Sequence, residues 1–425
     1  MTEADGRPVL RLWRWFDPPV IGVAALALAA GFGQFGAVAT LGDVAKSFGR
    51  ASEGTTVAEQ AGLSGSALGV GLAILRLASV ASLPIAALAD RFGRRTILLR
   101  TCGIGLALTV VAVASPDYWW FIAIFAFGRP LLSATTAVAQ VNAAEHTSVE
   151  ERSKAIALIA ASYGVGAGMT AIVHALTGET QFRLVYGLAV VPLALLPIIS
   201  RWVTEPDRFV RAGTSAEHSL PVLGAIAPEH RGRLLTVAVI TVAVSIVTGP
   251  ANSFLFVYAE NVLGLSGAVV AAMVIGSGGS GLVGLLVGRW LADRWGRRPT
   301  AALALAALSV CGMLAYSGSQ VALVIGYLLG VLAGSTFAPA AGALVNELFP
   351  TSVRASVAGW LVAAGVLGAV AGLVTFGAVA DIGNRFTLAA VLTFTPAVLA
   401  CALFRFLPET RGREPEDLWP TSARL

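Results

Sequence analysis

The sequence predicts an all-α membrane protein with twelve transmembrane helices, arranged as two pseudo-symmetric six-helix bundles. Of its 425 residues, 56% are hydrophobic and only 12% are charged, a composition far from that of soluble globular domains. The apolar residues form uninterrupted blocks of about 20, the length at which a helix crosses a bilayer. A charged motif that closes one apolar block returns later in the chain, which indicates an internal repeat.

The apolar blocks are continuous runs rich in alanine, leucine, valine and glycine. Such runs favour helices over the short alternating strands of a membrane β-barrel. The twelve helices are expected at residues 19–41, 65–89, 96–115, 118–141, 154–176, 182–200, 233–258, 266–292, 299–318, 321–345, 355–379 and 386–407.

The positive charge indicates membrane orientation rather than nucleic-acid binding. The formal net charge is +5, and most basic residues fall in loops on one side of the twelve-helix topology. Because cytoplasmic loops are enriched in lysine and arginine, we assign this side to the cytoplasm. The exceptions are Lys46, Arg50, Arg183 and Arg385 on the outer side, and Arg76 and Arg129 within helices. We therefore expect a multi-pass protein of the cell membrane with both termini in the cytoplasm.

The same topology divides the chain into five parts. A cytoplasmic N-terminal segment at 1–18 precedes an N-terminal six-helix bundle at 19–200. A cytoplasmic linker loop at 201–232 leads to a C-terminal six-helix bundle at 233–407, and a cytoplasmic tail occupies 408–425. The N-terminal segment lacks the apolar core of a signal peptide.

Charged motifs repeat between the two predicted bundles in the same order. The octapeptide "LADRFGRR" at 88–95 returns as "LADRWGRR" at 291–298, about 200 residues later. Two further motifs keep this offset: a glutamate followed seven positions later by an arginine, and a glutamate just after the last helix of each bundle. The matching pairs are Asp90 and Asp293, Arg94 and Arg297, Glu145 and Glu347, Arg152 and Arg354, and Glu205 and Glu409.

These motifs resemble those of a known family. The two octapeptides are similar to the signature loops after helices 2 and 8 of the major facilitator superfamily, although Ala86 and Arg289 replace the glycine usual four residues before the aspartate. The run "PETRG" at 408–412 and the paired Glu and Arg residues resemble motifs of the sugar-porter and metabolite/proton-symporter branches. The resemblance covers the whole chain and implies the twelve-helix fold of a secondary transporter that works by alternating access.

The repeated charged residues are candidates for a gating network. Each half offers an aspartate, two arginines and two glutamates at the cytoplasmic ends of its helices, where ion pairs could hold the halves together and then break. The family resemblance implies the same role. The alternative is that these residues only anchor the loops on the cytoplasmic side.

Two arginines lie inside apolar blocks, near the predicted membrane midplane. An arginine there costs roughly 2.5–3.5 kcal/mol on insertion scales, so Arg76 and Arg129 are predicted to have a function. No acidic residue lies at the same depth. An organic anion is one candidate counter-charge, since guanidinium groups fit carboxylates and phosphates. The alternative is that both arginines hydrogen-bond to carbonyls, serines and water inside the N-terminal half.

Polar residues at helical spacing predict a wet central cavity. The resemblance implies an acidic residue in helix 1 within a Gly-aromatic-Asp run, as in many proton-coupled sugar porters, whereas the similar stretch here reads Gly31-Phe32-Gly33-Gln34. The expected substrate-binding residues are Arg76, Arg129, Gln34, Ser133, Thr136, Tyr163, Thr248 and Asn252. Asp43, at the outer end of helix 1, is the candidate for proton coupling.

The leading functional hypothesis is a secondary transporter, not driven by ATP, that moves a small polar organic metabolite with proton coupling; organic anions are among the candidates. A proton-coupled drug or multidrug efflux antiporter is one alternative, although "SYGVGAG" at 162–168 lacks the Gly-Pro step of efflux proteins. A sugar transporter is another, although helix 7 lacks the paired glutamines of sugar porters. A channel is less favoured, because it does not explain the duplicated charged loops.

No enzyme activity is expected. The four histidines are scattered, and the sequence contains no Gly-x4-Gly-Lys phosphate-binding loop. No cofactor, metal site or nucleic-acid partner is expected either. The expected partners are the small-molecule substrate, protons and the lipid bilayer, and the expected oligomeric state is a monomer.

Overall fold

The computed structural model describes residues 14, 16–50, 57–177, 182–206, 228–382 and 385–412. Every regular element in these ranges is a helix, and twelve helical spans are long and apolar enough to cross a membrane. The predicted fold class and the twelve predicted spans are confirmed.

The ends of the spans shift by a few residues from the prediction. The largest differences are in the fourth span, which reaches His146, and in the seventh, which begins at Pro228 and ends at Val262. Hydropathy marks the apolar part of a helix, whereas the backbone hydrogen-bond ladder continues into polar flanking residues. These two helices are therefore longer than their apolar blocks.

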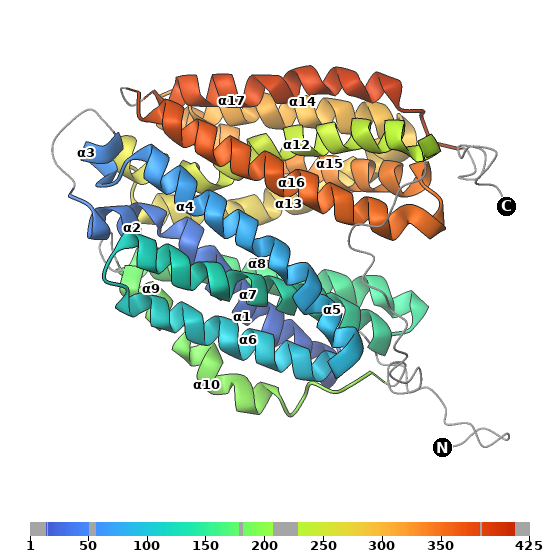
Figure 1. The fold of residues 1–425 in the computed structure, drawn as a ribbon, viewed down its shortest axis with the longest axis horizontal. Helices are drawn as coiled ribbons and strands as arrows, with labels where there is room; N and C mark the ends of the chain where they lie inside the picture. The colour runs from blue at the N-terminus through green and yellow to red at the C-terminus, as the bar shows by residue number, and fades with distance from the viewer. Residues whose placement is uncertain are drawn as a thin grey trace. The chain divides into compact units, whose positions relative to one another are not determined.

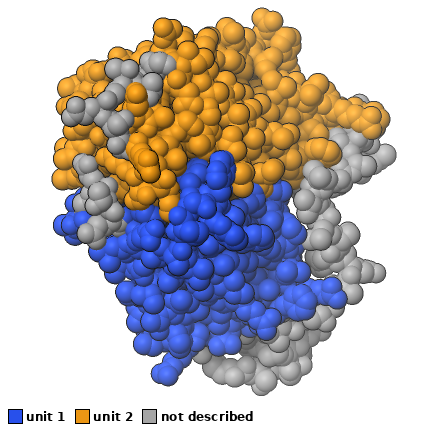
Figure 2. All heavy atoms as spheres, turned by 60° about the vertical axis from the view of Figure 1, so that its left-hand side comes forward, with its two compact units in different colours: residues 1–39, 78–220 blue, residues 40–77, 221–425 orange. Residues whose placement is uncertain are grey.

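Residues 1–39 and 78–220 form one compact unit, coloured blue in Figure 2. Its α-helices are labelled in Figure 1. Its helices are α1 (Pro18–Ala39), η1 (Ser79–Ala81), α5 (Ser82–Phe92), α6 (Arg94–Val111), η2 (Ala112–Ala114), α7 (Tyr118–His146), α8 (Val149–Thr177), α9 (Phe182–Gly187) and α10 (Val190–Ile199). We call this the first unit.

Residues 40–77 and 221–425 form the second unit, coloured orange in Figure 2. Its helices are α2 (Leu41–Phe48), α3 (Val57–Ala61), α4 (Gly65–Ala78), α12 (Pro228–Val257), η3 (Tyr258–Val262), α13 (Gly267–Arg294), α14 (Arg297–Ala315), α15 (Gln320–Leu348), α16 (Thr351–Ala380), α17 (Phe386–Ala400) and η4 (Cys401–Phe406). Here α12 and η3 together make the seventh span.

The two compact units do not match the predicted division of the chain at the linker 201–232 in one segment. Residues 40–77 belong to the second unit, so the second span begins there as α4 and continues in the first unit as α5. Most of the predicted N-terminal segment, linker and C-terminal tail lies outside the described residues. The division into bundles at 19–200 and 233–407 therefore stays a prediction.

In the first unit, α1 packs along α8 through glycines. A Cβ at Gly31 would lie 2.1 Å from the carbonyl oxygen of Tyr163, and a Cβ at Gly166 would lie 2.0 Å from a backbone oxygen of α1. Two helices approach this closely only where no side chain separates them. Thr170 adds a hydrogen bond from Oγ1 to the Phe32 carbonyl oxygen at 3.0 Å. The first and fifth spans thus form a tightly packed pair.

The same pairing recurs in the second unit between the seventh and eleventh spans. A Cβ at Gly368 would lie 2.4 Å from the carbonyl oxygen of Val242, and a Cβ at Gly372 would lie 2.5 Å from that of Ile246. Both glycines are on α16 and both carbonyls are on α12. The internal repeat seen in the charged motifs is therefore also present in the helix packing.

Some large apolar side chains are buried inside the units, and others are exposed on their surfaces. Each unit buries an aromatic cluster, made of Phe121, Phe125, Phe182 and Tyr186 in the first unit and of Tyr258, Tyr316, Phe376, Phe386 and Phe394 in the second. Many large apolar side chains instead point outward. Leu176, Phe127 and Leu399 are 81%, 74% and 70% exposed. Outward apolar side chains on the spans suit a lipid environment.

Candidate functional site

The charged residues predicted in the first half meet at one end of the first unit. Asp90, Arg94, Glu145 and Glu205 make up what we call the first junction. The Arg94 side chain is only 10% exposed, and its Nη2 lies 2.8 Å from Asp90 Oδ1. Its Nε and Nη2 each donate to a different oxygen of Glu145 at 3.0 Å. This two-point contact is the strongest common form of an arginine–carboxylate pair.

Glu205 caps the N-terminus of α6. Its carboxylate accepts hydrogen bonds from the backbone N–H of Arg94 and, at 3.0 Å, of Arg95. A carboxylate at this position satisfies N–H groups that have no partner inside the helix and interacts favourably with the helix dipole. Gly93 precedes the helix with a φ of 92°, and a Cβ there would lie 2.9 Å from Glu205 Oε2. Glycine is therefore needed at 93 for both the backbone and the cap.

The second junction, Arg297, Glu347 and Glu409, has the same design at the N-terminus of α14. Arg297 Nε lies 2.9 Å from Glu347 Oε2. Glu409 accepts hydrogen bonds from the backbone N–H of Arg297 at 2.9 Å and of Arg298 at 3.1 Å. Gly296 precedes the helix with a φ of 116°. In both junctions, the first two backbone N–H groups of the helix donate to the capping glutamate.

The second arginine of each octapeptide also has an equivalent role. Arg95 Nε donates to the Val203 carbonyl oxygen at 2.8 Å, and Arg298 Nη1 donates to the Leu407 carbonyl oxygen at 3.1 Å. Both carbonyls lie just after the last helix of their half. The first junction therefore connects the loop after the second span to the end of the sixth span. The second junction connects the loop after the eighth span to the end of the twelfth.

Three predicted network residues differ from the expected ion-paired arrangement. Asp293 is exposed and, unlike Asp90, has no ion pair within the part of the chain that the structure describes. Arg152 and Arg354 hydrogen-bond to backbone carbonyl oxygens near the ends of α7 and α15, each at 3.2 Å. All the contacts given above join residues of one unit. A role for these residues in holding the halves together stays a proposal.

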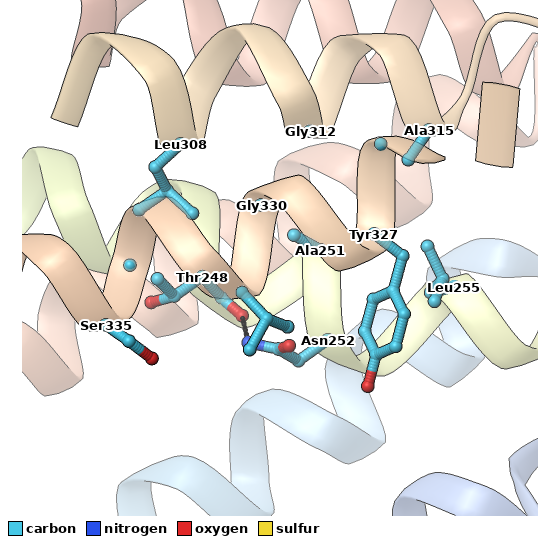
Figure 3. A pocket seen from close by; sticks show the side chains of 13 residues that line it. Thr248, Ala251, Asn252, Leu255, Leu308, Gly312, Ala315, Tyr327, Gly330 and Ser335 are labelled. Carbon is cyan, nitrogen blue, oxygen red and sulfur yellow. Dashed lines mark hydrogen bonds between the residues drawn. The ribbon is translucent and has the colours of Figure 1, made fainter. Parts of the chain in front are cut away.

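A cavity of about 260 Å³ lies in the second unit between α12, α14 and α15 (Figure 3). Two predicted substrate-binding residues, Thr248 and Asn252, line it together with Tyr327 and Ser335. Asn252 Nδ2 donates to the Thr248 carbonyl oxygen at 2.8 Å. None of the thirteen lining residues is charged.

Three polar groups at this cavity are available to a bound molecule. Among the described residues, the Thr248 hydroxyl, the Asn252 side-chain oxygen and the Ser335 hydroxyl make no hydrogen bond. Figure 3 shows Ser335 and Tyr327 toward opposite ends of the cavity, with Thr248 and Asn252 between them. The cavity thus offers hydrogen bonds but no formal charge.

In the first unit the structure brings together Gln34 and Ser133, two more predicted site residues. Ser133 Oγ donates to Gln34 Oε1 at 3.1 Å. The Gln34 side chain is only 7% exposed, and within the described ranges its Nε2 has no hydrogen-bond partner. A buried amide donor without a partner is costly unless a ligand or water uses it.

Other predicted residues have structural contacts. Thr136 Oγ1 donates to the Leu132 carbonyl oxygen at 3.2 Å, within its own helix. Tyr163 is half-buried at the close contact between α8 and α1. Arg76 lies in α4 of the second unit and Arg129 in α7 of the first, both half-buried. An anion site shared by the two arginines therefore stays a proposal.

The family model described as Major Facilitator Superfamily matches residues 23–291 and 278–423. The chain belongs to the Major Facilitator Superfamily. The resemblance inferred from the octapeptides is confirmed, and the chain is a multi-pass membrane transporter of this superfamily.

Solved structures of several transporters share the superfamily fold with this chain. The inward-open xylose transporter XylE from E. coli is 19% identical with a TM-score of 0.70, covering 94% of this chain and 98% of that one. The nucleoside transporter NupG is 14% identical with a TM-score of 0.75, covering 91% and 99%. The human organic anion transporter MFSD10 is 16% identical with a TM-score of 0.64, covering 92% and 99%. A comparison with curated proteins finds no match.

In this superfamily member, Asp43 does not lie in the first membrane helix. α1 ends at Ala39, and Asp43 belongs to the short helix α2, where it is 1% exposed. The sequence placed it at the outer end of helix 1, because the apolar block runs on to residue 41 without a helix-breaking signal. Its role in proton coupling stays a prediction.

Asp381 follows directly after α16. Its carboxylate caps the N-terminus of α4, accepting hydrogen bonds from Gly65 N, from Ser66 N at 2.8 Å and from Ser66 Oγ. A Cβ at Gly377 would lie 2.2 Å from the Gly65 carbonyl oxygen, so α16 and α4 are in close contact there. The only sequence signal was a Gly-Ser pair that opens one apolar block and an acid that follows another.

Proposed function

We propose that this chain is a secondary transporter that carries a small polar organic solute across the cell membrane by alternating access. The observation that carries the proposal is the pair of equivalent junctions, each built from an arginine on a glutamate and a second glutamate that caps the next helix. Transporters built from structural repeats bind substrate between the repeats and expose it to either side in turn. The proposed orientation puts both junctions and both termini in the cytoplasm, with a monomer as the working form.

The junctions are proposed to bias the inward-open and outward-open states. Asp90 is 52% exposed, so its ion pair with the buried Arg94 can exchange with water or with another partner at modest cost. The two capping glutamates instead hold helix ends rigidly, so that each unit moves as a body. Drug efflux and sugar transport are outcomes that the substrate screen described below distinguishes.

The solute is proposed to meet uncharged polar groups from both units. Gln34 and Ser133 supply them in the first unit, and Thr248 and Asn252 supply them in the second. An organic anion is the second candidate class of substrate. It is favoured by the half-buried arginines Arg76 and Arg129, because a guanidinium inside a membrane span normally faces a cavity or a partner. Asp43, a buried carboxyl next to the first span, is the proposed proton-coupling residue.

The proposed function is tested by counterflow in proteoliposomes. Purified chain is first screened by thermal shift against organic acids, sugars, nucleosides, phosphates and lipophilic cations, because a ligand that binds only the folded state raises its stability. Vesicles loaded with the best solute should then accumulate its labelled form transiently, faster than unloaded vesicles. Asp90→Asn should slow this exchange by more than it weakens binding. Flux without acceleration by internal solute would indicate a channel and contradict the proposal.

Proton coupling is checked in the same vesicles. An imposed pH gradient should drive net uptake or release, and a protonophore should remove that effect. Asp43→Asn should abolish the gradient-driven flux while leaving counterflow in place, because exchange of solute for solute requires no net proton movement.

A further inference from the structure

The cavity between α12, α14 and α15 has two chemically different parts. Asn252, which is exposed, and Thr248 make a polar edge on α12. Most of the remaining lining consists of apolar side chains and of backbone left open by glycines, and α15 adds Tyr327 and Ser335. The apolar part comprises Ala251, Leu255, Leu308, Gly312, Ala315, Gly326, Gly330, Val331 and Gly334.

The lining limits the charge of whatever occupies the cavity. An ion placed in an apolar site without a paired charge is strongly destabilised, whereas a hydroxyl or amide needs only one or two hydrogen bonds. The cavity offers the Thr248 hydroxyl, the Asn252 side-chain oxygen and the Ser335 hydroxyl, and no formal charge. An uncharged group with a hydroxyl or amide therefore fits, and a carboxylate or phosphate does not.

The volume sets the size of the group. A dry cavity of about 150 Å³ lined by aliphatic side chains is large enough to bind benzene. The cavity here has about 260 Å³. It therefore has room for a substituted ring or a branched aliphatic group.

We infer that this cavity is a side pocket of the transport site that takes the uncharged, largely apolar end of the transported solute, an aromatic or branched aliphatic group bearing a hydroxyl or amide. This inference rests on the proposed function. The apolar body lies between α14 and α15, and the hydroxyl or amide meets Thr248 and Asn252 on α12. Any anionic part of the same solute stays outside this pocket.

Two glycines on α15 set the volume of the pocket and can be changed without disturbing the packing. A Cβ at Gly330 would lie 3.7 Å from Cys311 Cβ, and a Cβ at Gly334 would lie 3.7 Å from Leu308 Cδ1, both ordinary contact distances. Alanine is also the better helix former, so the double replacement should not weaken α15. Gly342, on the same helix and outside the cavity, has no atom within 4 Å of a Cβ and provides the matched control.

The experiment measures binding of indole and of erythritol to the purified full-length chain by ligand-observed NMR. Indole supplies an uncharged ring with one hydrogen-bond donor, and erythritol supplies hydroxyls without an apolar body. We expect indole to bind the native chain, and the Gly330→Ala/Gly334→Ala double variant to lose at least about tenfold in indole affinity, as added methyl groups do in fitted pockets. Gly334→Leu should abolish indole binding, while Gly342→Ala should leave it unchanged.

Two results would overturn the inference. One is indole affinity unchanged in the double variant or in Gly334→Leu. The other is erythritol binding at least as tight as that of indole and lost in the same variants, which would make the pocket a polyol site. The binding results do not depend on transport. If the native chain binds indole but shows no counterflow, only the proposed function is contradicted. If the native chain shows counterflow but the variants bind indole as tightly as it does, only the side pocket is contradicted.

Discussion

Gly296→Ala is expected to lower the free energy of unfolding by about 2–4 kcal/mol and to abolish transport. With a φ of 116° and a ψ of 156°, Gly296 lies in a backbone region that essentially only glycine adopts. A Cβ there would also lie 2.6 Å from Glu409 Oε2, so the carboxylate that caps α14 must move. Two measurements check this. The midpoint of thermal unfolding in detergent should fall by several degrees, and counterflow should be lost.

A second glycine separates backbone strain from loss of the cap. Gly412 has a φ of 68° but no atom within 4 Å of a Cβ, so Gly412→Ala should cost no more than about 1–2 kcal/mol. Gly93→Ala should behave like Gly296→Ala, because a Cβ at 93 also meets a capping glutamate. Equal effects of the changes at 296 and 412 would show that the second junction contributes nothing beyond local backbone conformation.

Removal of the intramembrane arginines is the second large effect that we expect. If the solute is an organic anion, Arg76→Ala and Arg129→Ala should each reduce its counterflow at least about tenfold, because a hydrogen bond to a charged group contributes about 1.5–3 kcal/mol. The lysine variants should retain part of the activity, since they keep the charge but not the planar guanidinium. The measurement is the initial rate of counterflow with the best anionic solute from the thermal-shift screen.

Arg100→Ala is the matched control for charge removal, because Arg100 is an exposed arginine on α6 outside the proposed site. It should leave counterflow unchanged. Full activity of the Arg76→Ala/Arg129→Ala double variant would reject the anion site. An uncharged polar solute would then be the remaining one of the two proposed substrate classes.

The sequence predicted the spans and showed which charged residues are equivalent in the two halves, because both depend on signals that survive without tertiary structure. A run of apolar residues must be helical in lipid whatever its neighbours are. The charges at 90, 94, 145 and 205 return at the same offset in the second half, and a repeat reports shared structure directly.

The hydrogen-bond partners of individual side chains could not be predicted from the sequence, because they depend on where the helices end in space. Arg152 and Arg354 occupy equivalent sequence positions and were expected to pair with acids, yet each reaches a backbone carbonyl at the end of the preceding span. Thr136 hydrogen-bonds within its own helix, as isolated threonines in membrane helices commonly do, and its role in substrate binding stays a prediction. The cap that Asp381 makes on α4 joins residues more than 300 positions apart, and no local pattern reveals it.

Two related halves are proposed to place their junctions on the cytoplasmic face and to work together as one carrier. This proposal is tested most directly by labelling Arg91→Cys and Arg294→Cys, two exposed neighbours of the junctions, in a chain whose Cys102, Cys311 and Cys401 are replaced by alanine. A membrane-impermeant thiol reagent should label both positions in inside-out vesicles and neither in intact cells. Labelling of one position from each side of the membrane would contradict the account.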